Sequence, residues 1–365
     1  MLEQRYGGQV LLFYKAREAL KSALMLLGLD LSATVAVCGF TCYVVYQAVT
    51  EAGLKVEYLD IADGGLNFTA SQLEERLKTN PSIKVVIIQN TLGYPCEIRE
   101  IKKLCVDNQL ILIEDLAHSA GLVYLNGQEA GTMGDLAVLS FSQDKIIDGI
   151  SGGALIIRNK KLFPLFSIKF TNLNLRQQLL DRMYPMFTFL IRNSYDLAIG
   201  KILHLVLKQA GWLSSTINTA GILTIHSLPF WYCYLIKLQM EHLDMNLKHR
   251  REIARIYTRY LDKKMLSSAL ISQINNSTHV RFPILVDKRD SLITYLTKRG
   301  IHLADIWYDA PIAPGKYLQM TNYQSQCPVA EKISSRIVNL PTHGYVSGKY
   351  ARRITNLINQ WQLSQ

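Results

Sequence analysis

The first half of the chain alternates short apolar runs with segments of helical spacing, and this alternation limits the possible folds. Apolar runs that we interpret as strands lie at residues 34–38, 55–61, 85–89, 110–114, 136–141 and 154–158. Helical spacing occurs at 18–27, 43–52, 71–78 and 97–108, and Ser71 with Glu74 has the spacing of a capping box. Apolar strands that alternate with helices are typical of parallel sheets covered on both faces. We therefore predict an α/β fold with a mostly parallel central sheet.

The pattern changes after residue 159, and the change suggests how the chain is divided. Residues 162–223 are apolar and basic with few turn signals, whereas helical spacing returns at 231–262. A smaller α+β segment follows, with a strand at 280–286 and helices at 289–299 and 351–361. The 365 residues suffice for one large and one small domain. We expect a large α/β domain over 1–250, with 162–223 as an insert, and a small α+β domain over 251–365.

The positive charge of the chain is concentrated in one stretch. The net charge is +11, and between Arg158 and Lys208 nine basic residues face two acidic ones. The remainder is close to balance, which argues against a nucleic-acid surface over the whole protein. We therefore expect no nucleic-acid partner.

The cysteines and the N-terminus suggest the compartment. The six cysteines form no CxxC pair and no Cys/His spacing of a zinc site, so we expect free thiols and no metal. The first residues lack the pattern of a signal peptide, and uncharged apolar runs of 18 or more residues do not occur. These features favour a cytoplasmic protein.

Two residues with complementary chemistry follow neighbouring predicted strands. Asp115 comes directly after the strand at 110–114, and Lys145 lies just past the strand at 136–141. In parallel α/β sheets, ligands bind beyond the carboxyl ends of the strands. A lysine and a carboxylate there suit pyridoxal 5′-phosphate (PLP), because lysine forms a Schiff base with its aldehyde and the carboxylate keeps its pyridine nitrogen protonated. The alternative is that Asp115 caps a helix and Lys145 lies on the surface.

Five segments carry a resemblance to a known family. They are FTCYVVYQAVTEAGLKVEYLDI (40–61), GYPCEIREI (93–101), IEDLAHSAG (113–121), LSFSQDK (139–145) and CPVAEKISSRIVNLPTH (327–343). Together they resemble the DegT/DnrJ/EryC1/StrS family of PLP-dependent sugar aminotransferases. The similarity covers most of the chain except about 162–223. It implies the PLP-dependent transferase fold type I, which is the fold of aspartate aminotransferase.

The resemblance assigns roles to individual residues. By the family's motifs, Asp115 would bind the pyridine nitrogen, and His118 would lie against the cofactor. Ser140 would contact the cofactor phosphate, and Lys145 would be the Schiff-base lysine. Cys42 would occupy the position that stacks on the ring.

The chain departs from the family's pattern around the phosphate. The family commonly has a Gly-Thr pair at the start of its first helix, where this chain has Lys15-Ala16-Arg17-Glu18. A helix N-terminus still offers backbone amides to a phosphate, so Ala16 and Arg17 remain predicted cofactor contacts, with Arg17 adding charge. The family's phosphate-binding Asn, donated by the neighbouring subunit, would fall at 225–227, where His226 and Ser227 are the candidates to replace it.

The expected activity follows from the resemblance. It implies transfer of an amino group, usually from glutamate, to a nucleotide-linked keto sugar in cell-surface polysaccharide or related sugar biosynthesis, by a homodimer. One alternative is another PLP activity such as deoxysugar dehydration, in which relatives replace the lysine by His. A second is a catalytically idle regulatory or scaffold protein, because the phosphate site is altered.

Two further features remain open. The insert contains the apolar stretches 183–191 and 201–207 interspersed with basic residues, a pattern typical of helices that lie in the plane of a membrane surface. It predicts peripheral contact with the inner face of the cytoplasmic membrane, and the alternative is a lid or a dimer-packing element. The aromatic residues Trp307, Tyr308 and Tyr317 are expected to pack in the core rather than line a cleft.

Overall fold

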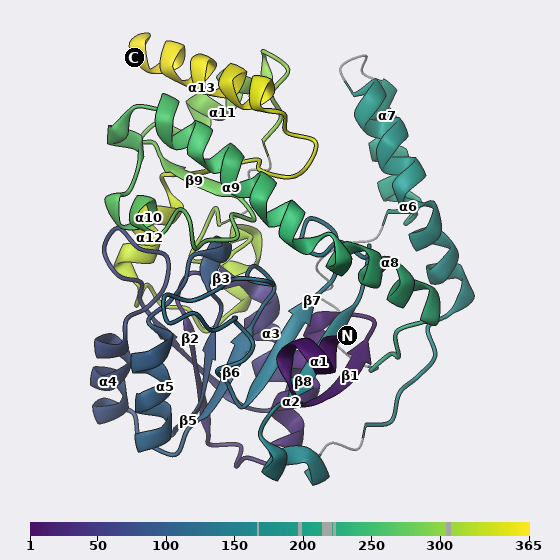
Figure 1. The fold of residues 1–365 in the computed structure, drawn as a ribbon, viewed down its shortest axis with the longest axis vertical. Helices are drawn as coiled ribbons and strands as arrows, with labels where there is room; N and C mark the ends of the chain where they lie inside the picture. Colours follow the sequence, from purple (N-terminus) through teal and green to yellow (C-terminus); the bar gives the residue numbers. More distant parts are fainter. Residues whose placement is uncertain (166–167, 196–198, 214–220, 222–223, 304–307) are drawn as a thin grey trace.

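A seven-stranded sheet forms the centre of the larger part of the molecule (Figure 1). The computed structural model describes the chain except for residues 166–167, 196–198, 214–220, 222–223 and 304–307. The strands are β1 (Gln9–Phe13), β2 (Thr34–Cys38), β4 (Lys55–Leu59), β5 (Ile83–Ile88), β6 (Ile111–Asp115), β7 (Leu136–Ser140) and β8 (Gly153–Ile157). Their order is β1-β8-β7-β6-β5-β2-β4. The pairs among β4, β2, β5, β6 and β7 are parallel, and β8 runs antiparallel to β7 and β1. The predicted α/β fold with a mostly parallel sheet is confirmed.

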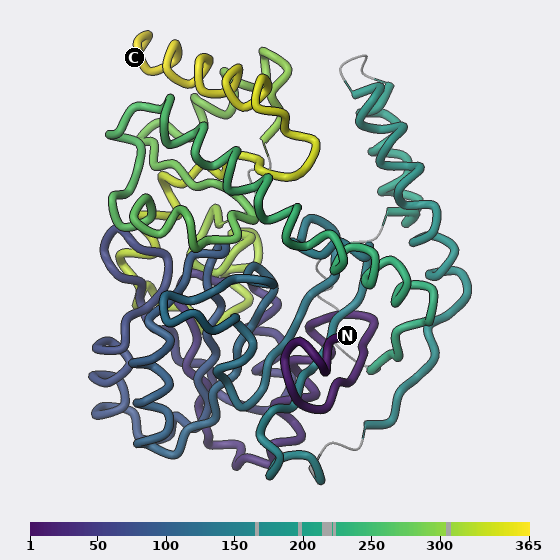
Figure 2. Tube along the Cα trace, in the orientation of Figure 1, coloured from purple at the N-terminus to yellow at the C-terminus, as the bar shows by residue number. Residues whose placement is uncertain are grey.

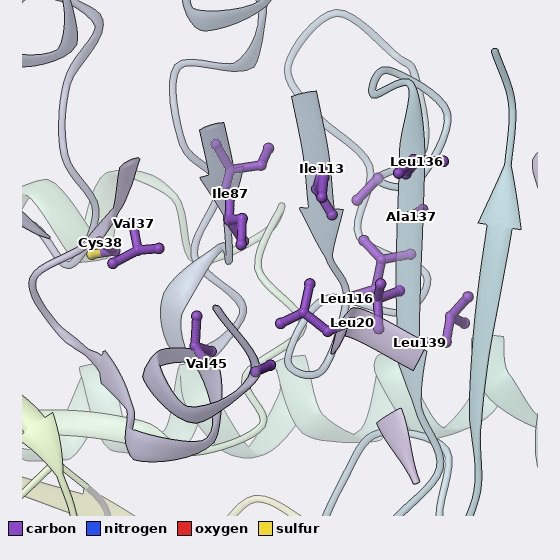
Figure 3. Close-up of a cluster of buried hydrophobic side chains, with 14 of the residues drawn as sticks. Leu20, Val37, Cys38, Val45, Ile87, Ile113, Leu116, Leu136, Ala137 and Leu139 are labelled. Carbon is purple, nitrogen blue, oxygen red and sulfur yellow. The ribbon is translucent and has the colours of Figure 1, made fainter. Parts of the chain in front are cut away.

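Helices cover both faces of this sheet, and several of its strands are buried along their whole length. All five residues of β2, β7 and β8 are buried, so both faces of these strands are covered. The helices of this part are α1 (Leu2–Tyr6), α2 (Ala16–Leu26), α3 (Tyr43–Glu51), α4 (Ala70–Thr79) and α5 (Ile98–Asp107), with short 3₁₀ turns η1 (Thr91–Gly93) and η2 (Lys160–Leu165). Figure 3 shows part of the core, in which Leu20 of α2 and Val45 of α3 join strand side chains such as Ile113.

Local details differ from the sequence predictions in two places. The capping box of α4 is formed by Thr69 and Gln72, not by Ser71 and Glu74, because the helix begins earlier than predicted. The single helical stretch predicted at 231–262 is two helices, α8 (Phe230–Glu241) and α9 (Leu243–Tyr260), which meet at His242.

The C-terminal part is an α+β unit with a core of its own. Strands β9 (Phe282–Leu285) and β11 (Ile337–Leu340) pair antiparallel. The helices of this part are η3 (Lys263–Met265), α10 (Ser268–Ser272), α11 (Arg289–Thr297), η4 (Gly315–Met320), α12 (Pro328–Ser334) and α13 (Gly348–Leu363). Helices η3, α11 and α13 contribute to this core, whereas the buried apolar residues of α10 and α12 belong to the large cluster. Helix α9 connects the two cores, because its Leu247 belongs to the large cluster and its Ile253 to the smaller one. The short strand β10 (Ile312–Ala313) returns to the large part and pairs with β3 (Thr41–Cys42).

The insert forms a helical hairpin beside the sheet domain. Helices α6 (Leu175–Ser194) and α7 (Ile199–Gln209) pack on each other around Phe187, Ile191 and Leu207. Both traces place the hairpin beyond α8, away from the central sheet, with the C-terminus of the chain at the opposite side (Figures 1 and 2). Among the described residues, none of the helices has both the length and the apolar character needed to cross a bilayer.

Candidate active site

A pocket lies at the carboxyl ends of the parallel strands. Asp115 ends β6 and Ser140 ends β7, and Gln89 follows β5. The start of α2 closes the pocket on one side, and Tyr308 contributes from the C-terminal part. Seven of the residues that the sequence predicted for the site line this pocket: Ala16, Arg17, Cys42, Asp115, His118, Ser140 and Lys145.

The loop between β7 and β8 brings Lys145 into the pocket. The Phe141 N–H donates to the Gly152 carbonyl and the Gly149 N–H donates to the Phe141 carbonyl, both over 2.9 Å. These bonds fold the loop back onto the end of the sheet. Within it, Asp144 has a φ of 64°, a left-handed conformation that Asp tolerates better than most residues. The side chain of Lys145 is thereby directed to the same pocket as Asp115 on the neighbouring strand.

Burial dominates the electrostatics of this pair. It lowers the pKa of Lys145, whereas the nearby Cys42 and Asp115 act in the opposite direction. Burial also raises the pKa of Asp115, which the Ala117 N–H and Lys145 oppose. An amine with a lowered pKa is more often neutral and therefore nucleophilic. The pocket thus favours an amine that can attack a carbonyl carbon.

His118 is held as a neutral imidazole. The Leu92 N–H lies 3.3 Å from Nδ1 of His118, so Nδ1 accepts a hydrogen bond and the ring proton is on Nε2. Burial, followed by the charge of Lys145, lowers the pKa of His118 well below its ordinary value. The ring therefore presents an uncharged surface to the pocket.

Two pocket residues were missed or misjudged from the sequence. Gln89 accepts a hydrogen bond from the Thr41 hydroxyl and donates one to the Tyr308 hydroxyl over 2.7 Å. Its place directly after a predicted strand was the signal that could have identified it. Tyr308 was expected to pack only in the core, but it lines the pocket with a φ of 62°, which is strained for an aromatic residue.

Of the other two aromatic residues of that group, only Tyr317 lies in the part of the chain that the structure describes. Tyr317 stacks on Tyr43, with ring centroids 5.1 Å apart, and does not belong to the lining. Trp307 lies outside the described residues.

The start of α2 lies against the ends of β7 and β8. Ser140 pairs with Gly153 across these strands, and a Cβ on Gly153 would be 2.5 Å from the Ala16 nitrogen. Only glycine permits that approach, so the first turn of the helix reaches the strand ends. Lys15, the N-cap residue, donates a hydrogen bond to the Ser151 hydroxyl over 2.7 Å. This corner combines backbone N–H groups, hydroxyls and a cation, which is the chemistry of an anion site.

The proposed substitutes for the family's cross-subunit Asn have other contacts within the chain. Nδ1 of His226 lies 3.2 Å from Oε1 of Glu18, and the His226 N–H donates to Oε2 of the same residue over 3.0 Å. Ser227 forms an isolated bridge with Phe13. Neither His226 nor Ser227 lines the pocket in the part of the chain that the structure describes.

Comparison with known proteins decides the family. The model of the DegT/DnrJ/EryC1/StrS aminotransferase family matches residues 10–170 and 232–359. The chain belongs to this family. The two matched segments leave out most of the insert, which contains the α6–α7 hairpin.

Relatives and solved structures agree with the assignment. The chain is 23% identical to the GDP-perosamine synthase of Vibrio cholerae over 355 residues, covering 94% of this chain and 83% of that protein. It is 25% identical to the dTDP-4-amino-4,6-dideoxy-D-glucose transaminase of Shigella dysenteriae, covering 84% and 74%. Among solved structures, the aminotransferase TlmJ of Streptoalloteichus hindustanus matches with a TM-score of 0.74 at 21% identity, covering 99% of this chain and 89% of that one. This likeness confirms the fold.

Enzymes of this family depend on PLP, and the residues of the pocket fit that group. Asp115 is 7% exposed, and in the described chain its carboxylate accepts a hydrogen bond only from the Ala117 N–H, over 2.9 Å. A buried carboxylate with so few partners is costly unless a cation joins it, and a protonated ring nitrogen is such a cation. Lys145 provides the amine, and the corner at Ser140 and α2 provides donors for a phosphate. A group of three or more side chains suited to a metal ion does not occur among the described residues.

Proposed function

We propose that this aminotransferase moves an amino group from glutamate to a keto group of a nucleotide-linked sugar, in cell-surface polysaccharide or related sugar biosynthesis. The observation that carries the proposal is the meeting of Asp115 and Lys145 in one desolvated pocket, on neighbouring strand ends of a chain of this family. The names of two relatives, a GDP-perosamine synthase and a dTDP-4-amino-4,6-dideoxy-D-glucose transaminase, support the nucleotide-sugar substrate.

Each pocket residue has a distinct task in this proposal. When bound, PLP supplies an aldehyde for the amine and a conjugated ring that takes up electrons. Asp115 would hold the proton on the ring nitrogen, because its buried negative charge favours the protonated form of a neighbouring base. The Lys145 amine would take up the proton that leaves the amino-bearing carbon of glutamate, and would later donate a proton to the former keto carbon of the sugar. His118 and Cys42 line the pocket wall and would contact the ring.

A transamination assay tests the proposal. The purified protein is incubated with PLP, glutamate and a panel of GDP-, UDP- and dTDP-linked keto sugars, and 2-oxoglutarate is measured. We expect 2-oxoglutarate beyond a single equivalent per active site only when a nucleotide keto sugar is present, because the bound cofactor alone can accept one amino group from glutamate. The Lys145→Ala variant should release none. Cofactor binding without turnover on any member of the panel would instead favour the idle regulatory or scaffold protein.

We also propose a two-domain homodimer in the cytoplasm. Residues 1–250 would bind the cofactor and 251–365 would form the small domain, since the two hydrophobic clusters meet within α9. Phe230, Tyr234 and Leu238 of α8 are 88%, 67% and 42% exposed and recur every four residues, so they form one apolar face. A second copy of the chain would cover it. Light scattering should give a dimer for the natural protein and a monomer for Tyr234→Glu, and a monomeric natural protein would contradict the proposal.

The α6–α7 hairpin supports peripheral contact with an anionic membrane. Its exposed apolar side chains lie on the outer sides of the two helices: Leu175, Leu179, Met186, Phe189 and Leu190 in α6, and Ile199, Ile202, Leu205 and Val206 in α7. Five basic residues of these helices are exposed, and their one acidic residue, Asp181, is buried. An apolar face with a basic complement suits an anionic surface, at about 1 kcal/mol for each basic residue near it.

Flotation with vesicles separates this proposal from the alternatives. We expect the protein to float with vesicles containing phosphatidylglycerol at low salt, and not with phosphatidylcholine alone. Lys201→Glu combined with Lys208→Glu should abolish flotation, whereas the matched change of Lys263 and Lys264, outside the hairpin, should not. A protein that stays in the soluble fraction would favour the lid or the dimer-packing element.

A further inference from the structure

The corner of the pocket at the start of α2 contains a lysine whose surroundings suit an anion. Lys15 lines the pocket, and its Nζ donates to the Ser151 hydroxyl over 2.7 Å and lies 4.5 Å from the centroid of the Tyr14 ring. An ammonium group has three donors, and within the described residues one hydroxyl accepts from it. Asp181 and Glu18, the nearby carboxylates, form no ion pair within 4 Å of Nζ among the described residues. The ammonium therefore has donors for a further acceptor.

A buried carboxylate from the insert holds the residue next to this lysine. Asp181 of α6 is 0% exposed, and its Oδ2 accepts hydrogen bonds from the hydroxyls of Tyr14, at 2.8 Å, and Tyr232, at 2.5 Å. Its Oδ1 accepts one from the Gln177 amide at 2.8 Å. Asp181 is thus fully engaged, and it fixes the Tyr14 ring on which the Lys15 ammonium lies.

The backbone at this corner is fixed as well. Lys15 forms a parallel bridge with Gly152, and the Tyr14 N–H donates to the His226 carbonyl over 3.0 Å. The backbone of Lys15 is consequently fixed next to the first turn of α2 and near Ser140. Ser140 is the position that contacts the cofactor phosphate in the family. Burial lowers the pKa of Lys15 to about 8, and the charge of Asp181 opposes that shift, which favours the ammonium form.

We propose that Lys15 binds the phosphate of the cofactor in place of the contacts that the family's Gly-Thr pair supplies, and that Asp181 positions Lys15 through Tyr14. The inference rests on the proposed function only in taking PLP as the ligand. It gives the insert a role at the catalytic pocket, because α6 contributes the carboxylate that organises this corner. Lys15 is a binding residue here, and Asp181 is a positioning residue.

Binding of two ligands that differ only in the phosphate tests the role of Lys15. Pyridoxamine 5′-phosphate and pyridoxamine both lack the aldehyde, so neither bonds covalently to Lys145, and calorimetry on the full-length protein gives the Kd of each. We expect Lys15→Met to raise the Kd of pyridoxamine 5′-phosphate about 10- to 100-fold, the range for a charged hydrogen bond, and to leave that of pyridoxamine unchanged. Lys15→Arg, which keeps the charge, should recover most of the affinity. Lys84→Met, the same change at an exposed lysine whose Nζ contacts only the Pro81 carbonyl among described residues, should alter neither Kd.

The variant Asp181→Asn tests the positioning role. Asn retains an oxygen that accepts from the tyrosine hydroxyls but lacks the charge, so the Kd of pyridoxamine 5′-phosphate should rise less than in Lys15→Met, with that of pyridoxamine unchanged. A loss in Lys15→Met that is equal for both ligands, or absent for both, would overturn the inference. That result would leave the proposed function standing, since only the transamination assay and Lys145 test it. Inorganic phosphate, titrated separately, shows whether the corner binds a free anion: a Lys15-dependent stabilisation supports the site, and a stabilisation equal in Lys15→Met contradicts it.

Discussion

The pocket and the α6–α7 hairpin both combine apolar and basic side chains, but they place their charges differently. In the pocket, Lys145 and Asp115 are buried and come from neighbouring strand ends. In the hairpin, basic residues are exposed next to apolar ones, such as Phe189 at 66%. Buried opposite charges are typical of a catalytic site. Exposed charges beside exposed apolar side chains are typical of an interaction surface.

The two regions are nevertheless connected. Asp181 joins α6 to Tyr14, next to the start of α2, and Tyr195 after α6 lies 4.9 Å from the ring of His302 in the C-terminal part. The hairpin therefore contacts the rest of the molecule, which we call the body, at a buried polar cluster and at an aromatic pair. Perturbations of the two regions should differ strongly in their effect on catalysis, and the following changes test that difference.

The largest effect is expected from Lys145→Ala. Lys15, the other lysine that lines the pocket, lies at the start of α2 and donates to Ser151, so it does not replace Lys145 next to Asp115. Transamination and the visible absorbance of lysine-bound PLP should therefore both disappear. Lys145→Arg keeps the charge but should be equally inactive, because the guanidinium stays protonated. Full transamination by either variant would show that the site is assigned to the wrong residue.

A smaller loss is expected from Asp115→Asn. The amide cannot hold the ring nitrogen protonated by its charge, so the rate should fall by about 10² or more, as for the loss of one preorganised contact. Steady-state kinetics with glutamate measure it. A wild-type rate would contradict the role of Asp115 in holding that proton.

Acid should destabilise the body through a buried histidine. Burial lowers the pKa of His279 to about 4, and Nε2 lies 2.7 Å from the Ile274 carbonyl. The unfolded chain binds the proton near the ordinary pKa of 6.5 and the native state does not, so the free energy of unfolding falls between pH 6.5 and about 4. The expected loss is roughly 3 kcal/mol. Chemical denaturation across this range should show a smaller loss for His279→Gln, and equal losses in both proteins would exclude His279 as the cause.

Loss of the hydrogen bond that links the hairpin to the body should lower the free energy of unfolding by somewhat less than acid does through His279. Tyr232→Phe removes one hydrogen bond to the carboxylate of Asp181, so the free energy of unfolding should fall by about 2 kcal/mol. Tyr345→Phe, the same change at an 87% exposed position outside α8 and the hairpin, serves as the control and should have no effect. Equal stability of the two variants would mean that the buried cluster does not hold the hairpin to the body.

The smallest effect is expected on the outer face of the hairpin. Phe189→Ser and Leu205→Ser change exposed side chains, so stability in solution should shift by no more than about 0.5 kcal/mol, with transamination unchanged. Phe187→Ala, in the small core between α6 and α7, should by contrast increase hydrogen exchange of the hairpin amides. A loss of transamination in Phe189→Ser would indicate that this face lies over the pocket, as a lid would.

Much of the sheet could be predicted because its signals are local. The strand predicted at 34–38 is β2, and the helix at 289–299 is α11 to within two residues of its end, because apolar runs and turn residues act over short distances. The edge strand β1, which pairs with β8 from the other end of the sheet domain, was not predicted, since its burial is mixed and its partner is distant in sequence.

The sequence by itself determined the alternation of strands and helices, and with it the placing of Asp115 and Lys145 at adjacent strand ends. Only the tertiary structure decided what surrounds them. Tyr308 meets Gln89 across 219 residues, Lys15 meets Ser151 across 136, and Tyr14 meets Asp181 across 167. No local pattern encodes such contacts, because each depends on how separate elements pack and on which polar groups that packing removes from water.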